Sequence, residues 1–186
     1  MLDELLIKEK LKKKLSPRRY EHSIGVAYTA AAMAMVYDVN IKAAKYAGLL
    51  HDYGKCLSDE DKIKKCKKYG LHISSAESKN PELLHAKLGA YYAKNNFKIT
   101  NEDILSAIAY HTTGRPNMSI LEKIIFIADY IEPNRKPLKD IDIIRKEAFT
   151  DMNQCIEHIL SNTISYLERN DMVIDNISKE TYEYYK

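Results

Sequence analysis

The positions of the few glycines and prolines constrain the fold of this chain more than any other feature of its sequence. Six glycines and five prolines occur among 186 residues, and several of them stand where a helical pattern begins or ends. Ser16-Pro17 and Asn80-Pro81 are both typical of a helix N-cap followed by proline at the first helical position. No run of alternating apolar and polar residues is long enough to predict a strand. The sequence therefore predicts an all-α protein.

The spacing of apolar residues predicts where these helices lie. After an amphipathic N-terminal segment, helices are predicted over residues 17–37, 41–52, 59–69, 82–96, 101–111, 119–132 and 142–170. Thr100 with Asp103 is the predicted N-cap of the helix over 101–111. Pro133 ends the predicted helix over 119–132. A chain of this length can bury a hydrophobic core without disulfides, and no linker or repeat interrupts it. We therefore expect a single helical domain over residues 1–186.

Composition excludes several classes of protein. Lys and Arg total 29 and Asp and Glu total 26, which is too balanced for a protein that coats nucleic acid. The longest uncharged run, residues 23–37, is too short to cross a bilayer, and the N-terminus lacks the apolar stretch of a signal peptide. The three cysteines have no CxxC spacing, which indicates a reduced compartment. We expect a cytoplasmic protein with no membrane and no nucleic-acid partner.

Histidines and isolated aspartates carry the functional signal. His22, His51, His85 and His111 each lie within or at the end of a separate predicted helix, and Asp52 directly follows His51. The other two histidines, in a polar loop and on an amphipathic helix, are assigned no role. Asp129 lies in the strongly apolar segment IIFIADYI, where an ionised group is costly unless it is paired or bound to a metal ion.

These residue types suit metal-dependent phosphate chemistry. Imidazole and carboxylate ligands without thiolates suit Fe, Mn, Zn or Ni, and they disfavour a structural zinc site. Neighbouring residues of a helix point about 100° apart, so His51 and Asp52 both reach one site only at a helix end, which Tyr53-Gly54 supplies. A carboxylate can also bridge two metal ions, and His85 and His111 could bind the second ion or contact phosphate.

The order and context of these residues resemble a known family. The motifs are RRYEHSIGVA at 18–27, AGLLHDYGK at 47–55, LLHAKLGA at 83–90 and AIAYHTTGRPNMSILEKIIFIADYIEPNR at 107–135. They resemble the HD-domain metal-dependent phosphohydrolases, which are all-α, and within them the YqeK family of symmetrical diadenosine-tetraphosphate hydrolases. The resemblance implies an HD-domain helical bundle with a family-like core over about residues 16–150 and a helical extension over 151–186.

The resemblance also implies a metal centre and a reaction. It implies iron, as one or two ions, held by the four residues His22, His51, Asp52 and Asp129. Manganese, cobalt or nickel are the expected substitutes. His85 and His111 are expected to hold a second metal ion or to contact the substrate phosphates. The implied reaction cleaves diadenosine tetraphosphate at the centre of its phosphate chain and releases two ADP.

Further residues near these motifs are candidates for contact with the substrate. Asp52 and Lys55 are the candidate catalytic residues. The candidate substrate-binding residues are Arg19, Thr112, Thr113 and Arg135. The arginines suit bidentate contacts with phosphate, and the small turn that begins at Thr112 could present N–H groups to it. The chain departs from the family after residue 135, where KPLKDID replaces an expected Pro-Gly turn.

Other functions are kept as alternatives. A nucleotidase or nucleoside triphosphate phosphohydrolase of the HD superfamily would use the same metal ligands but would release free phosphate or nucleoside from a mononucleotide. A binding module with a vestigial site would use the basic N-terminal segment, and its affinity for nucleic acid would depend steeply on salt. The complete set of ligands favours an enzyme. A homodimer is a further expectation. The sequence leaves the base preference for the nucleotide substrate open.

Overall fold

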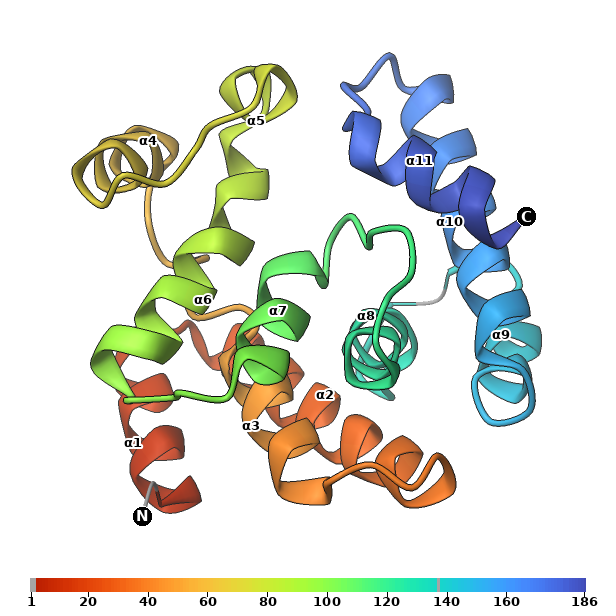
Figure 1. The fold of residues 1–186 in the computed structure, drawn as a ribbon, viewed down its shortest axis with the longest axis horizontal. Helices are drawn as coiled ribbons and strands as arrows, with labels where there is room; N and C mark the ends of the chain where they lie inside the picture. Colours follow the sequence, from red (N-terminus) through yellow and green to blue (C-terminus); the bar gives the residue numbers. More distant parts are fainter. Residues whose placement is uncertain (1–2, 137) are drawn as a thin grey trace.

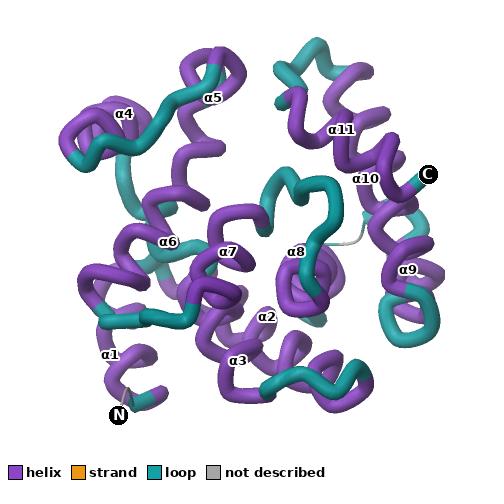
Figure 2. The backbone as a smooth tube through the Cα atoms, viewed as in Figure 1, coloured by secondary structure: helices purple, strands orange, loops and turns teal. Residues whose placement is uncertain are grey.

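The computed structural model describes residues 3–136 and 138–186, and all regular secondary structure in this described part is helical (Figure 2). The elements in chain order are α1 (Glu4–Lys14), α2 (Pro17–Val36), α3 (Ile41–Leu50), α4 (Asp59–Lys68), α5 (Ser75–Lys79), the 3₁₀ helix η1 (Pro81–Leu83), α6 (Leu84–Asn96), α7 (Glu102–Tyr110), α8 (Ile120–Ile131), α9 (Ile141–Glu147), α10 (Met152–Arg169) and α11 (Asn176–Tyr185). The all-α prediction is confirmed.

The helices α2, α3, α7 and α8 form the centre of the bundle. The helix α2 packs against α3 and α8, while α7 packs against α3, α6 and α8. Figure 1 shows α4, α5 and the start of α6 on one side of this centre and α9, α10 and α11 on the other. The helix α10 packs on both α8 and α11. Because α8 contacts both α2 and α7, residues from distant parts of the sequence meet beside it.

Small residues let α2 and α3 approach closely. Ala27 and Ala30 of α2 and Ala44 and Ala47 of α3 are all buried. A Cβ atom added to Gly48 would lie 2.7 Å from the backbone Cα of Ala27, so only glycine fits at this crossing. This close packing places the end of α3 beside the first turns of α2, which is where the candidate metal ligands lie.

Two predicted helix boundaries are wrong. The N-cap of α7 is Asn101 rather than Thr100, because the Asn101 side chain accepts from the backbone N–H groups of Asp103 and Ile104. The helix predicted over 142–170 is two helices, α9 and α10. Asp151 starts α10 as its N-cap, so the chain turns where apolar spacing alone indicated one helix. The segment after Arg135 that departs from the family pattern includes residue 137, which lies outside the described residues.

The last helix reaches the loop that follows His111. The Tyr185 hydroxyl accepts a hydrogen bond of 2.9 Å from the backbone N–H of Met118. Gly114 has a positive φ of 62°, and a Cβ atom there would lie 2.8 Å from Cγ2 of Thr181. The helix α11 therefore covers the turn in which the candidate residues Thr112 and Thr113 lie. No helix in the described residues is long and apolar enough to cross a bilayer.

The three cysteines are unpaired and differ in their surroundings. Cys56 is exposed, whereas burial raises the pKa of Cys66 to about 11 and that of Cys155 to about 12. Because the thiolate is the reactive form, we expect a thiol reagent at pH 8 to modify Cys56 alone in the folded protein. Counting released chromophore should give one thiol without denaturant and three with it, and none in folded Cys56→Ser. Rapid modification of a second thiol in the folded protein would contradict this.

Candidate metal centre and active site

The side chains that the sequence marks for metal or phosphate chemistry meet at one point in the bundle. They are His22 on α2, His51 and Asp52 at the end of α3, His85 on α6, His111 at the end of α7 and Asp129 on α8. All of them are buried except Asp129, whose side chain is 16% exposed. Five helices thus contribute to one compact polar cluster inside an apolar bundle.

One half of this cluster lies between α2, α3 and α8. The Nε2 atom of His22 lies 2.9 Å from Oδ1 of Asp129 and 3.7 Å from Oδ2 of Asp52. The Nε2 atom of His51 lies 3.4 Å from the same Asp52 oxygen and 3.7 Å from Oδ1 of Asp129. One ligand atom from each of His22, His51 and Asp129 falls within 4.8 Å of the others. These atoms are close enough to share one metal ion.

The other half lies on the opposite side of the Asp52 carboxylate. Its second oxygen, Oδ1, lies 3.3 Å from Nε2 of His85 and 3.6 Å from Nε2 of His111. The two imidazole Nε2 atoms are 3.1 Å apart, and His51, Asp52 and His111 form a second group of candidate ligands. Asp52 thus faces a different pair of histidines with each oxygen, an arrangement that a carboxylate bridging two metal ions requires.

Hydrogen bonds at Nδ1 orient three of these imidazoles. His51, His85 and His111 each lie next to the backbone carbonyl three residues earlier, with Nδ1 to oxygen distances of 2.6 Å for His51 and 2.7 Å for His111. A carbonyl oxygen only accepts, so Nδ1 carries the proton and Nε2 keeps its lone pair. That lone pair points into the cluster, as metal-binding histidines require.

Buried atoms without hydrogen-bond partners show that the donor set fits a metal ion. Among the described residues, these atoms are Nε2 of His22, Nε2 of His51 and Oδ1 of Asp52. Leaving such groups unpaired inside a protein is costly, and native structures rarely do so without a bound water, ion or functional reason. A cation between His22 and His51 would satisfy both imidazole nitrogens, and Oδ1 of Asp52, which faces His85 and His111, would be satisfied by a second cation or a hydrogen-bond donor.

The two carboxyl groups are ionised because of their neighbours. Burial raises the pKa of Asp52, but the electrostatic interaction with His51 and the hydrogen-bond contacts with His111 and His51 lower it by more, so the pKa lies well below its usual range. Burial also raises the pKa of Asp129, but the hydrogen bond with His22 and the charge of Arg135 lower it by more, so this pKa too lies well below its usual range. Both side chains are therefore carboxylates at neutral pH.

The pKa values of the histidines shift in different directions because their surroundings differ. Burial lowers the pKa of His51 and lowers that of His85 well below its usual range, so both imidazoles are neutral at neutral pH. Burial lowers the pKa of His22 as well, but Asp129 and then Glu132 raise it by more, and the net direction is upward. In the metal-free protein a proton thus competes with a metal ion for His22.

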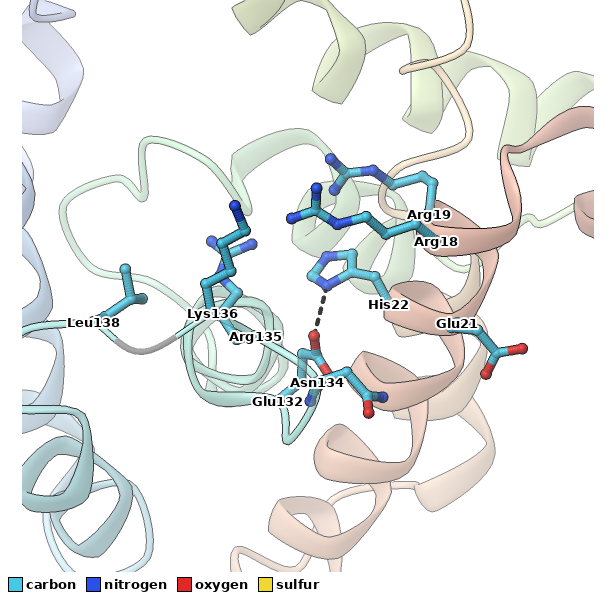
Figure 3. A pocket seen from close by; sticks show the side chains of 9 residues that line it. All are labelled: Arg18, Arg19, Glu21, His22, Glu132, Asn134, Arg135, Lys136 and Leu138. Carbon is cyan, nitrogen blue, oxygen red and sulfur yellow. Dashed lines mark hydrogen bonds and ion pairs between the residues drawn. The ribbon is translucent and has the colours of Figure 1, made fainter.

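A basic cavity opens beside the metal cluster. It has a volume of about 520 Å³, and it reaches His22 at its inner end. Its cationic lining consists of Arg18 and Arg19 from α2 and Arg135 and Lys136 from the loop after α8. Figure 3 shows the four cationic side chains on either side of the opening above His22. The cavity thus offers positive charge to an anion that approaches the metal ligands.

The candidate cations already pair with the carboxylates of the cluster. Nη1 of Arg19 lies 2.6 Å from Oδ2 of Asp52, and Nζ of Lys55 lies 3.3 Å from its Oδ1. Nη1 of Arg135 lies 3.5 Å from Oδ1 of Asp129. These three side chains are partly exposed, and Arg19 and Arg135 also line the cavity, so both can turn from a carboxylate toward an anion there.

The two threonines have different positions. Oγ1 of Thr112 lies 3.2 Å from Nε2 of His111 and 3.4 Å from Nε2 of His85, so its hydroxyl belongs to the cluster. The hydroxyl of Thr113 instead donates to the carbonyl of Gly114, and the N–H of Gly114 donates to the carbonyl of Tyr110. The structure therefore brings Thr112 to the site and engages Thr113 within its own turn.

Sequence reasoning missed Glu132, which is buried behind His22. Its Oε1 lies 3.0 Å from Nδ1 of His22 (Figure 3). The missed signal is a second acidic residue three positions after Asp129, on the same side of an apolar helix. Arg18 and Lys136 were also missed, because only the fold brings the two basic pairs to one opening.

Comparison with known proteins places the chain in a family. A family model described as the HD domain matches residues 19–134, which is more than half of the chain. The protein belongs to the HD-domain family. This membership confirms the resemblance inferred from the motifs around His22, His51 and Asp52, and the matched range ends beyond Asp129.

Individual relatives show which group within the HD-domain family this chain belongs to. This HD-domain protein is 42% identical to the symmetrical bis(5'-nucleosyl)-tetraphosphatase of Halalkalibacterium halodurans, over 92% of this chain and 91% of the relative. It is 40% identical to the protein of the same name from Bacillus subtilis, over 88% of this chain and 87% of the relative. It thus belongs to the family of these symmetrical tetraphosphatases.

A solved structure shares the whole fold. The crystal structure of an HD-superfamily hydrolase from Clostridium acetobutylicum, described as involved in NAD metabolism, matches with a TM-score of 0.95 at 39% identity. The match covers 100% of this chain and 97% of that one. The HD-domain helical bundle predicted from the sequence is therefore confirmed.

Proposed function

We propose that this protein hydrolyses dinucleoside tetraphosphates symmetrically, converting diadenosine tetraphosphate and water into two ADP. The observation that carries the proposal is the buried histidine and aspartate cluster at the inner end of a cavity lined by four cationic side chains. A tetraphosphate chain is a highly charged anion, and the cavity matches that charge. The relatives that share this family carry the same activity in their names.

The reaction defines what the site must do. Water adds to one of the two central phosphorus atoms, and the bond from that phosphorus to the central bridging oxygen breaks. The bridging oxygen leaves with the other half, so each half becomes a nucleoside diphosphate and the water gives up its protons. The chain must therefore neutralise the phosphates, align the bridge and accept a proton.

The metal ligands proposed from the sequence agree with the donor atoms that lack partners. His22, His51, Asp52 and Asp129 would hold one metal ion, and Asp52 with His85 and His111 would hold a second ion or contact phosphate. Such an ion supplies charge stabilisation on phosphate oxygens and lowers the pKa of bound water. We propose iron in the cell, with manganese, cobalt or nickel as substitutes, as the family resemblance implies, and imidazole and carboxylate ligands are compatible with these metals.

The surrounding cations would act on the substrate itself. Arg19 and Arg135 lie at the boundary between cavity and cluster, where each can exchange its carboxylate contact for a phosphate contact. Lys55 lies on the other side of Asp52, where it would neutralise charge on the departing diphosphate. Thr112 can donate its hydroxyl to a phosphate oxygen near His85. Thr113 stays a proposal with weaker support, because its hydroxyl is engaged.

Three broader properties also stay proposals. We propose one domain over residues 1–186, with a core over about 16–150 and a helical extension over 151–186, and the packing of α10 on α8 supports it. The unpaired cysteines support a reducing compartment such as the cytoplasm. The homodimer remains a prediction from the sequence.

Product analysis tests the proposed function. The protein is incubated anaerobically with diadenosine tetraphosphate and Fe²⁺, Mn²⁺, Co²⁺ or no added metal, and the products are separated by chromatography. We expect ADP as the sole nucleotide product and a strong dependence on metal. ATP plus AMP would contradict symmetrical cleavage. Release of phosphate or nucleoside from mononucleotides, with no cleavage of the dinucleotide, would instead support the nucleotidase or triphosphate phosphohydrolase alternative.

A further inference from the structure

His22 differs from the other histidines of the site in its position on its helix. His51 and His111 are C-cap residues, and His85 lies in the first turn after a 3₁₀ helix. The Nδ1 atoms of His51 and His111 therefore find backbone carbonyls left free at a helix end, and Nδ1 of His85 contacts the carbonyl of Glu82 in η1. His22 lies inside α2, where the carbonyls of the preceding turn are already engaged. An acceptor for Nδ1 of His22 has to come from another element.

Glu132 supplies that acceptor from the end of α8. Its side chain is 1% exposed, and a buried carboxylate needs hydrogen-bond donors around it. Oε1 faces Nδ1 of His22 at 3.0 Å, and Oε2 accepts from the backbone N–H of Asn134 at 2.7 Å. Figure 3 shows the first of these contacts as the link between α2 and the loop after α8. Both oxygens are thus engaged.

The backbone around Glu132 is itself held in place. Nε of Arg145 donates to the carbonyl of Ile131 at 3.1 Å, and its Nη2 lies 3.5 Å from the carbonyl of Glu132. The carbonyl of Glu132 also accepts from the N–H of Arg135. The carboxylate is therefore fixed relative to the loop that carries the cations of the cavity.

The sequence of α2 makes room for this carboxylate. Gly25 lies one turn after His22, and a Cβ atom there would lie 2.3 Å from Oε2 of Glu132. It would also lie 3.4 Å from the side chain of Asn134. A larger residue at position 25 would therefore push the Glu132 carboxylate away from its place behind His22.

We propose that Glu132 is a positioning residue that keeps the Nε2 lone pair of His22 aimed at the metal centre, and that Gly25 is the space it requires. The carboxylate accepts the Nδ1 proton of His22, so Nε2 is left free as a ligand and the ring cannot rotate. The same side chain joins His22 to the loop of Arg135, so the metal ligand and the phosphate-facing cations move as one unit. This inference rests on the proposed metal-dependent function, but metal affinity tests it without substrate.

The test is a titration of the metal-free protein with Co²⁺, in which the visible absorption of the bound ion measures binding. Partners of metal-binding histidines typically contribute about 10- to 100-fold in metal affinity. We expect a loss of about this size for Glu132→Ala and for Gly25→Ala. Glu132→Gln should lie between the unchanged protein and Glu132→Ala in Co²⁺ affinity, because its amide oxygen can still accept from Nδ1 of His22, but its NH₂ group then faces the backbone N–H of Asn134 and that hydrogen bond is lost.

Glu21→Gln is the matched control. Glu21 lies next to His22 on α2, but its side chain points away from His22 in Figure 3. We expect this variant to bind Co²⁺ as the unchanged protein does, with the same absorption spectrum. Circular dichroism of each metal-free variant shows whether it is folded at the temperature of the titration, and Glu132→Gln keeps the test informative if Glu132→Ala unfolds.

Two results would overturn the inference. One is unchanged Co²⁺ affinity and spectrum in folded Glu132→Ala or Glu132→Gln while His22→Ala loses affinity, which would leave the metal centre intact but Glu132 without a role. The other is equal weakening in Glu132→Gln and Glu21→Gln, which would indicate a general effect of charge. Failure of the unchanged protein to bind any metal would contradict the proposed function itself, and is distinct from both.

Discussion

Replacing Asp52 with asparagine should reduce metal-dependent hydrolysis by about 1,000-fold or more, as expected when a group central to the reacting site is removed. Asp52 is fully buried, and it contacts His22 and His51 with one oxygen and His85 and His111 with the other. The amide keeps the shape but has no negative charge, and it offers only one oxygen. It can neither bridge the two halves of the cluster nor balance the cations around it.

The measurement is the rate of ADP release from diadenosine tetraphosphate at saturating metal, with Asp61→Asn as the control. Asp61 is exposed on α4, so this control removes a carboxylate without touching the cluster. Circular dichroism should show that Asp52→Asn is folded. A folded Asp52→Asn protein with activity near that of the control would place the chemistry elsewhere.

Replacing Gly54 with alanine should destabilise the protein by about 3 kcal/mol, the upper end of the usual cost of overpacking. A Cβ atom at this position would lie 2.4 Å from the backbone oxygen of His85 and 3.1 Å from its carbonyl carbon and Cα. Since the clashing atoms are backbone, a change of side-chain rotamer cannot relieve the contact. The clash would push the turn that carries Asp52 away from the start of α6, so activity should fall with stability.

Gly70→Ala provides the comparison. Gly70 has a left-handed backbone conformation, with φ at 68°, but no atom lies within 4 Å of the added Cβ. Its cost is the strain of a left-handed conformation, about 1 kcal/mol. Urea unfolding of the metal-free variants measures both free energies. Equal losses for the two variants would show that the contact between Gly54 and His85 is not a constraint.

Much of the helical architecture could be predicted from local signals. Ser16 caps α2 by accepting from the N–H of Arg19, and Ser119 with Glu122 forms a capping box at the start of α8. Such signals act through residues three or four positions apart, so the sequence displays them directly. Local signals failed where competing caps lie side by side, as at Thr100 and Asn101, and where apolar spacing continues through the turn before Asp151.

The residues of the candidate metal site could also be chosen from the sequence, and their role as ligands stays a prediction. A histidine or aspartate in an apolar segment has to be paired or ligated, and this physical cost marks His51, Asp52 and Asp129 without any knowledge of the fold. Lys55 lies three residues after Asp52, and the two side chains pair as this spacing allows, whereas Arg19 was chosen as an arginine suited to phosphate and reaches Asp52 only across the packing of α2 on α3. Their roles with substrate stay predictions.

The sequence by itself determined the helices, their caps and the residue types of the metal cluster, because these depend on local hydrogen bonds and on the cost of burying charge. Only the tertiary structure decided which Asp52 oxygen faces which histidines, that Glu132 lies behind His22, and that two basic pairs share one cavity. These relations depend on how α2, α3 and α8 cross, and that crossing is set by close packing at Gly48 and Gly25. Interatomic distances across helices have no counterpart in sequence spacing, so packing alone fixes them.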